Sequence, residues 1–270
     1  MRSTAVLDRG TSTPQHDVND LLVLWQHPVT REIVPIGRFI REGGAFAFSY
    51  TRAAAEVNGF RPLPGMTDLH RRYESRQIPA VFSQRVMSPE RPDYAQYMDT
   101  LGLTTALATP WEQIVESGGD RAGDTLQFMP IPRVTCGRAQ ARFLANGVSH
   151  IPEDERVLPG RSIRVTRQEQ EEALRGLRVG DGVLLEPELR NPEDPNAVLV
   201  TASGVPVGWV PRVLSSGVRQ LVQNAPCHAT VHRIGSPNAP FHLRLVLDLN
   251  VPVPSGFAFD REGRWQALAS

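Results

Sequence analysis

A bend rich in asparagine, proline and aspartate separates two apolar runs in the second half of the chain. The bend covers Asn191 to Ala197, between the runs Val183 to Leu185 and Val198 to Val200. Asn and Asp side chains bond to nearby backbone amides and favour turns, and short apolar runs bounded by such residues are typical of strands. A second apolar edge, Gly208 to Arg212, is interrupted by a proline and then turns amphipathic. The pattern predicts strands joined by an Asn/Asp-built bend.

Together, the bend and the segment Gly208 to Arg212 resemble the HIRAN domain, whose pattern reads N-P-(aromatic)-D-x-N-A-(apolar) and then G-(aromatic)-(apolar)-P. In that family the module is a small β-barrel that can bind single-stranded DNA at its free 3′ end. The resemblance implies that Asp194 lies beside the terminal sugar, where a carboxylate accepts a hydrogen bond from a 3′-hydroxyl and repels a 3′-phosphate. The alternative is that Asn191, Asp194 and Asn196 only build the turn, and it stays open.

The residues that stack on bases in the family are largely replaced here. The family usually places an arginine and tyrosines just after the first strand, where this chain has Ser149, His150 and Ile151. Its aromatic residue before the aspartate is Glu193 here, and the charge of Glu193 opposes a phosphate. Since stacking is worth on the order of 1–3 kcal/mol per base, these replacements weaken, alter or remove binding.

Six residues remain as candidates for nucleic-acid binding. We expect His150 to stack on a base, and Arg190 and Arg212 to meet phosphates because they lie close to the bend in sequence. Trp209 falls in a strand and is expected to pack in the core. The predicted binding residues are Asp194, His150, Asn191, Asn196, Arg190 and Arg212.

Composition limits the mode of binding and the compartment. The chain has 29 basic and 29 acidic residues, so its net charge is zero, and every basic residue is an arginine. A broad basic field for non-specific phosphate binding is therefore not expected, although capture of a strand end needs only a few placed groups. No apolar run is long enough to span a bilayer, and the N-terminus lacks a secretory apolar stretch. We expect a cytoplasmic protein that does not bind membranes.

The chain is long enough for two domains of the α+β class. We expect a small antiparallel sheet with helices in the first half and a small HIRAN-like β-barrel with one or two packed helices in the second. The predicted segments are a disordered lead-in over residues 1–19, a first domain over 20–132, a linker over 133–140, a second domain over 141–253 and a loose tail over 254–270.

Periodicity and capping signals place the elements within these segments. Expected strands cover residues 21–25, 33–40, 45–50, 126–130, 141–145, 183–187, 198–200, 205–210 and 241–249. Expected helices cover residues 52–57, 92–101, 109–117, 166–176 and 212–222. Two of these helices begin with a capping box, Thr109 with Glu112 and Thr166 with Glu169.

The first half is similar to the N-terminal subdomain of HipA-type toxin kinases. The similarity rests on short motifs, which are residues 46–50, 63–65, 82–88, 91–94, 118–123 and 126–130. In those kinases the ATP-binding core follows, whereas here the HIRAN-like half follows, with no P-loop and no kinase catalytic loop. Kinase activity is therefore not implied. Because an equivalent subdomain restrains the toxin in some operons, the resemblance implies a regulatory or partner-binding role.

No arrangement of residues argues for catalysis or for a bound cofactor. His228, His232 and His242, with Cys227 nearby, could in principle gather on strands, but His228 and His232 are too far apart along a strand to share a metal. Cys136 and Cys227 lack the spacing of a zinc site and are expected as unpaired thiols. We expect no metal, no cofactor and no catalytic residues.

The sequence therefore favours a non-enzymatic two-domain adaptor. Its second half would bind single-stranded DNA ends or distorted DNA, and its first half a protein partner, in a stress, repair or defence setting. One alternative is a pure protein-interaction regulator, such as a toxin-restraining protein, in which DNA binding is lost. A hydrolase or nuclease with an unrecognised site is a third hypothesis, and it requires carboxylates or histidines gathered in one cleft.

Overall fold

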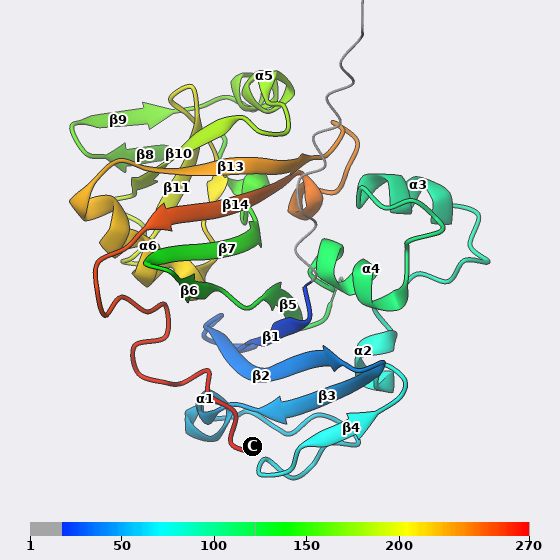
Figure 1. The fold of residues 1–270 in the computed structure, drawn as a ribbon. Helices are drawn as coiled ribbons and strands as arrows, with labels where there is room; N and C mark the ends of the chain where they lie inside the picture. Colours follow the sequence, from blue (N-terminus) through cyan, green and yellow to red (C-terminus); the bar gives the residue numbers. More distant parts are fainter. Residues whose placement is uncertain (1–17, 122, 270) are drawn as a thin grey trace, which may run out of the picture.

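The computed structural model describes residues 18–121 and 123–269. The predicted lead-in over residues 1–19 thus lies outside the described residues, apart from Val18 and Asn19. Within the described part, sheets and a few short helices give a mixed fold that fits the predicted α+β class (Figure 1). None of the described helices is long and apolar enough to cross a membrane.

The first half is built on a five-stranded antiparallel sheet in the order β4-β3-β2-β1-β5. Its strands are β1 (Asp20–Gln26), β2 (Ile33–Glu42), β3 (Ala45–Tyr50), β4 (Tyr73–Ser75) and β5 (Leu126–Pro130). Four short helices accompany it, α1 (Arg52–Glu56), α2 (Ala80–Ser83), α3 (Tyr94–Thr100) and α4 (Pro110–Ser117). The sequence predicted β1, β2, β3, β5, α1, α3 and α4 but neither β4 nor α2.

Helix α4 begins and ends where its sequence signals predict. The Thr109 side chain accepts a hydrogen bond from the backbone N–H of Glu112, Pro110 occupies the first turn, and Gly118 ends the helix with φ 67°. Only one half of the predicted capping box is therefore present. Trp111 and Ile114 of α4 are buried in the core of the first half with Phe39 and Phe128.

The second half is built on a seven-stranded antiparallel sheet in the order β12-β11-β10-β13-β14-β7-β6. Its strands are β6 (Arg133–Thr135), β7 (Arg138–Leu144), β10 (Gly182–Pro187), β11 (Val198–Ala202), β12 (Val205–Trp209), β13 (Cys227–Ile234) and β14 (Leu245–Pro252). A separate hairpin consists of β8 (Glu155–Leu158) and β9 (Arg161–Arg164). The helical pieces are η1 (Val148–His150), α5 (Arg167–Gly176), α6 (Arg212–Asn224) and η2 (Phe241–Leu243).

The edge strand β12 meets the end of β7, next to the other edge strand β6, at one point. Asn146, just after β7, forms a single bridge with Trp209 at the end of β12, through N–H···O distances of 2.8 and 2.9 Å. No further ladder joins the two strands among the described residues, so the predicted closed barrel is not confirmed. Helix α5 has the predicted capping box, with both the Thr166 and the Glu169 bond in place.

Three segments differ from the sequence expectation. Residues 133–140, predicted as a linker, form β6 and the start of β7 and so belong to the seven-stranded sheet. Residues 241–243, predicted as the start of the last strand, form the 3₁₀ turn η2. The tail over residues 254–270, predicted to be loose, returns to the first half, where Ala267 bridges Thr51 and Leu268 donates a backbone hydrogen bond to Tyr50.

The two halves pack against each other through β1, which lies with β5 between them (Figure 1). Successive side chains of a strand point to opposite faces. Accordingly Leu21 and Val23 are buried in the core of the first half, whereas Leu22 and Leu24 are buried in the core of the second. Strand β1 therefore contributes to both cores, so the two halves form one continuous structure and are not separate domains joined by a linker.

Candidate nucleic-acid interface

The loop between β10 and β11 is shaped by its own side chains. The Asn191 side-chain oxygen accepts backbone hydrogen bonds from Glu193 (2.9 Å) and Asp194 (3.0 Å). Asp194 Oδ1 in turn accepts the backbone N–H of Asn196 at 2.8 Å. These are the side-chain-to-backbone bonds that build Asx turns. Asn191 and Asp194 thus build the turn, as one of the two sequence interpretations has it.

Building the turn does not use all of the Asp194 carboxylate. Its Oδ1 is occupied by Asn196, but no group among the described residues bonds to Oδ2. Asp194 and Asn196 are partly exposed, and Arg190 at the start of the loop is exposed. One carboxylate oxygen is therefore held in a fixed position with a free acceptor site, which is the geometry needed to receive a hydroxyl.

His150 lies on the short turn η1 that follows β7. The turn begins at Gly147, whose φ is 63° and whose missing side chain makes room for the Trp209 ring; a Cβ there would lie 2.6 Å from it. Val148 and Ile151 are buried, whereas the ring of His150 is exposed. Of the residues that replace the family's stacking positions, Ile151 is thus a core residue and His150 alone offers an exposed ring.

A buried carboxylate joins η1 to the loop 190–196. Glu188, only 2% exposed, accepts hydrogen bonds from the Asn191 side chain at 2.6 Å and from the Trp209 indole at 2.7 Å. Its other oxygen lies 3.6 Å from the Arg156 guanidinium, which donates at 2.5 Å to the carbonyl of His150. Predicted site residues from two separate segments are thereby held in one network.

Arg156 also covers the indole of Trp209, with its guanidinium carbon 4.8 Å from the ring centroid. Trp209 packs with Ile151, Leu158 and Leu199 in a small cluster. Its role is therefore structural, because its ring packs in this cluster and against Arg156, and its N–H group donates to Glu188. Sequence reasoning missed Glu188 and Arg156, since neither belongs to a recognised motif.

An exposed aromatic ring lies beside η1. Phe241 on η2 is 43% exposed, and the Arg167 guanidinium sits 5.0 Å from its ring centroid. Arg167 also donates to the carbonyl of Ser149 at 3.0 Å, which fixes the pair against η1. The sequence placed Phe241 in a strand. Pro237 and Pro240 just before Phe241 were the sequence signal against a strand here, because proline cannot donate a hydrogen bond to a strand ladder.

Arg212 anchors the loop instead of standing free beside it. From the start of α6, its guanidinium donates to the carbonyl of Glu193 in the loop and, at 3.3 Å, to the carbonyl of Arg31 in the first half. Farther along α6, Arg219 donates to the carbonyls of Glu188 (2.8 Å) and Ala197 (2.9 Å) at the base of the loop. Both arginines therefore fix the loop to α6.

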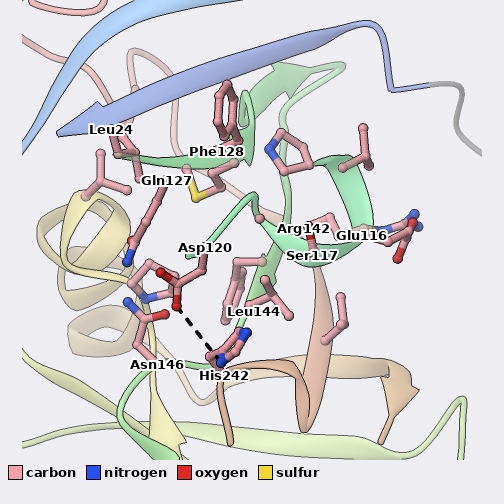
Figure 2. Close-up of a pocket in the computed structure, with 18 of the residues that line it drawn as sticks. Leu24, Glu116, Ser117, Asp120, Gln127, Phe128, Arg142, Leu144, Asn146 and His242 are labelled. Atoms are coloured by element: carbon pink, nitrogen blue, oxygen red, sulfur yellow. Dashed lines mark ion pairs between the residues drawn. The ribbon is translucent and has the colours of Figure 1, made fainter. Parts of the chain in front are cut away.

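A small pocket lies where the two halves meet (Figure 2). Asp120 and His242 face each other in it at 4.0 Å, and Gln127 and Asn146 reach toward the same space. Its volume is about 70 Å³. Since one water needs roughly 10–15 Å³, the pocket holds a few waters and is too small for a nucleobase.

No group of three or more His, Cys, Asp or Glu side chains that could hold a metal occurs among the described residues. His232 pairs instead with Asp248 at 3.1 Å. Burial raises the pKa of Asp248, but hydrogen bonds from His232 and Arg142 outweigh it and lower that pKa to about 2. Both cysteines are free thiols, and burial raises the pKa of Cys227 to about 11.

Comparison with known families places the second half. Residues 142–254 match the HIRAN domain family, which confirms the predicted resemblance of the C-terminal half. A HIRAN domain suggests binding of nucleic acid, and of DNA in particular. The predicted HipA similarity of residues 20–132 gains no support and stays a prediction. No match was found among curated proteins or among solved structures.

Proposed function

We propose that the chain is a non-enzymatic nucleic-acid-binding protein whose HIRAN half binds the 3′ end of single-stranded DNA on the surface formed by η1 and the loop 190–196. The observation that carries the proposal is the Glu188 network, which holds the exposed His150 turn and the Asp194 loop together. The surface offers a free carboxylate oxygen for a terminal hydroxyl. It also offers two exposed rings, His150 and Phe241, for stacking.

Asp194 gives the first test. The wild type should bind a strand ending in a 3′-hydroxyl more tightly than one ending in a 3′-phosphate, because the carboxylate accepts from the former and repels the latter. A hydrogen bond to a charged group is worth about 1.5–3 kcal/mol, so Asp194→Ala should lower affinity for the hydroxyl end by about 10-fold to 100-fold. Fluorescence anisotropy with 5′-labelled strands measures both affinities.

Glu193→Ala is the matched control, since it removes the neighbouring exposed carboxylate and leaves the Asn191 bonds intact. It should keep the preference for the hydroxyl end and raise affinity for both ends alike. Equal affinities of the wild type for both ends would contradict end recognition.

Phe241 gives the second test. Stacking on an aromatic side chain contributes about 1–3 kcal/mol per base, so Phe241→Ala should weaken strand binding by about 10-fold or more, whereas Phe241→Trp should retain it. Leu107→Ala, which truncates an exposed apolar side chain in the first half, is the control and should bind as the wild type does. If Phe241→Ala bound the strand as tightly as the wild type does, Phe241 would not be part of the binding surface.

We extend the proposal to the first half, which would bind a protein partner and make the chain an adaptor. This extension rests on the similarity of residues 20–132 to the HipA N-terminal subdomain that the sequence motifs predict. The alternative is a pure protein-interaction regulator, and the replacement of the family's arginine and aromatic residues by Ser149, Ile151 and Glu193 favours it. Absence of strand binding by the wild type at low salt would select this alternative.

A further inference from the structure

A groove runs between the two halves, away from η1 and the loop 190–196. One wall is the C-terminal end of α3 and the turn after it, with Asp99 and Gly102, and the other is the C-terminal end of α5. Four arginines line the groove, Arg175, Arg178, Arg233 and Arg244. Its volume of about 510 Å³ falls within the roughly 300–1,000 Å³ typical of ligand sites.

The charge of the groove is positive because the acids near its floor are already paired. Arg244, 1% exposed, holds both Glu171 oxygens at 2.9 and 3.0 Å. Arg233 lies 3.8 Å from Glu116 and donates to two backbone carbonyls. Among the described residues that line the groove, Asp99 is the one remaining acid, against the two exposed arginines Arg175 and Arg178.

The two exposed arginines have donors to offer. Arg178 uses its NH1 group to cap the carbonyls of Arg175 and Leu177 at the end of α5, at 2.7 and 2.9 Å. These two bonds fix the guanidinium, whose positive charge offsets the partial negative charge at the C-terminal end of the helix. The Arg175 side chain makes no hydrogen bond or ion pair within the described part of the chain. Both can therefore contact an anion without losing an internal bond.

Helix α5 connects this groove to the proposed end-binding surface. Arg167, Glu171 and Arg175 are spaced by four residues and so share one flank of the helix. Glu171 is neutralised by Arg244, which leaves a basic line from Arg167, beside Phe241 and η1, to Arg175 in the groove. With a rise of about 1.5 Å per residue, Arg167 and Arg175 are about 12 Å apart along the axis.

We propose that the groove between α3 and α5 binds backbone phosphates of a single strand whose 3′ end lies at η1 and the loop 190–196. The inference rests on the proposed function and adds a second contact region farther up the strand. Bound there, the strand contacts both halves of the protein, because Asp99 and Gly102 belong to the first half and the arginines to the second. Affinity then depends on strand length.

The experiment compares 5′-labelled oligothymidylates of about 3 and about 15 nucleotides with free 3′-hydroxyl ends, a span that brackets the usual single-strand site sizes. The full-length wild type should bind the longer strand more tightly. The double variant Arg175→Ala/Arg178→Ala should bind the short strand as the wild type does and the long strand about 10-fold more weakly. Its salt slope for the long strand should fall by about 1.4, as expected for two lost phosphate contacts.

The matched control is Arg61→Ala/Arg76→Ala, which removes the same charge from exposed positions in the first half. An equal loss of affinity in the control would attribute the effect to net charge and overturn the proposal. If the wild type bound the short strand but bound the long strand no more tightly, the groove proposal alone would be overturned. The same holds if Arg175→Ala/Arg178→Ala bound the long strand as the wild type does. Failure of the wild type to bind either strand would overturn the proposed function and the groove together.

Discussion

Replacing Glu188 with alanine should lower the free energy of unfolding by about 3–5 kcal/mol, the usual cost of removing one partner from a buried ion pair, and should abolish end recognition. The Asn191 amide and the Trp209 indole lose their acceptor, and the Arg156 guanidinium loses a buried counter-charge while it keeps its bond to the His150 carbonyl. In partly buried positions, an unsatisfied donor and an unpaired charge both cost free energy.

The functional loss follows from geometry. Glu188 bonds to Asn191 in the loop that carries Asp194 and lies beside Arg156, which donates to the turn that carries His150, so its removal takes away a contact that joins these two segments. The change is measured by urea unfolding and, on the folded fraction at low temperature, by anisotropy with a 3′-hydroxyl strand. Binding should fall even where the variant is folded.

Glu188→Gln separates charge from shape. Its amide oxygen still accepts from Asn191 or Trp209, but it no longer attracts Arg156, so stability and binding should both lie between those of wild type and Glu188→Ala. Glu155→Ala, an exposed acid on β8, is the control and should change neither. If Glu188→Ala unfolded at the wild-type urea concentration, the network would not be what holds the two segments together.

The parts of the fold that depend on local signals were predictable from the sequence. Strands β11 and β12 were predicted from the apolar periodicity of residues 198–200 and 205–210, and α5 from the capping box of Thr166 with Glu169. The loop 190–196 was predicted from the spacing of its Asn and Asp residues, which favour turns. In each case the residues that determine the structure are neighbours in sequence, so the pattern carries the information.

What the sequence could not predict depends on distant partners. In the sequence Glu188 is an ordinary acid just after a strand, and its burial is decided by Arg156 and Trp209, which come from two other strands. The tail over residues 254–270 was predicted to be loose, yet its docking depends on backbone groups of the first half such as Tyr50. Pairings of this kind leave no local pattern.

Arg233→Ala should lower the free energy of unfolding by about 3–5 kcal/mol, because Arg233 joins the two halves. From β13 it donates to the carbonyl of Thr100 at 2.5 Å and to that of Glu116 at 2.8 Å, at the C-terminal ends of α3 and α4. Helix C-termini carry partial negative charge and unsatisfied carbonyls. One guanidinium therefore caps two helices of the other half.

The Arg233 side chain is largely buried and closely packed. Burial lowers its pKa, while the charge of Glu116 acts to raise it, and arginine stays protonated in proteins at neutral pH. A Cβ at Gly102 would lie 3.0 Å from the Arg233 side chain, and the φ of Gly102 is +70°, so glycine is required there. Arg233→Lys keeps the charge but cannot fork to two carbonyls, and it should recover only part of the lost stability.

Hydrogen exchange and nucleic-acid binding distinguish this role from a general loss of stability. In Arg233→Ala, exchange should quicken first at the C-terminal ends of α3 and α4, where the capped carbonyls lie, while β10 to β12 keep their protection. Because Arg233 holds the end of α3, which is one wall of the groove, the folded variant should lose the length-dependent part of strand binding and keep the short-strand part. Uniformly faster exchange across both sheets, or an unchanged urea midpoint, would show that the halves are held together by their shared β1 core and not by this arginine.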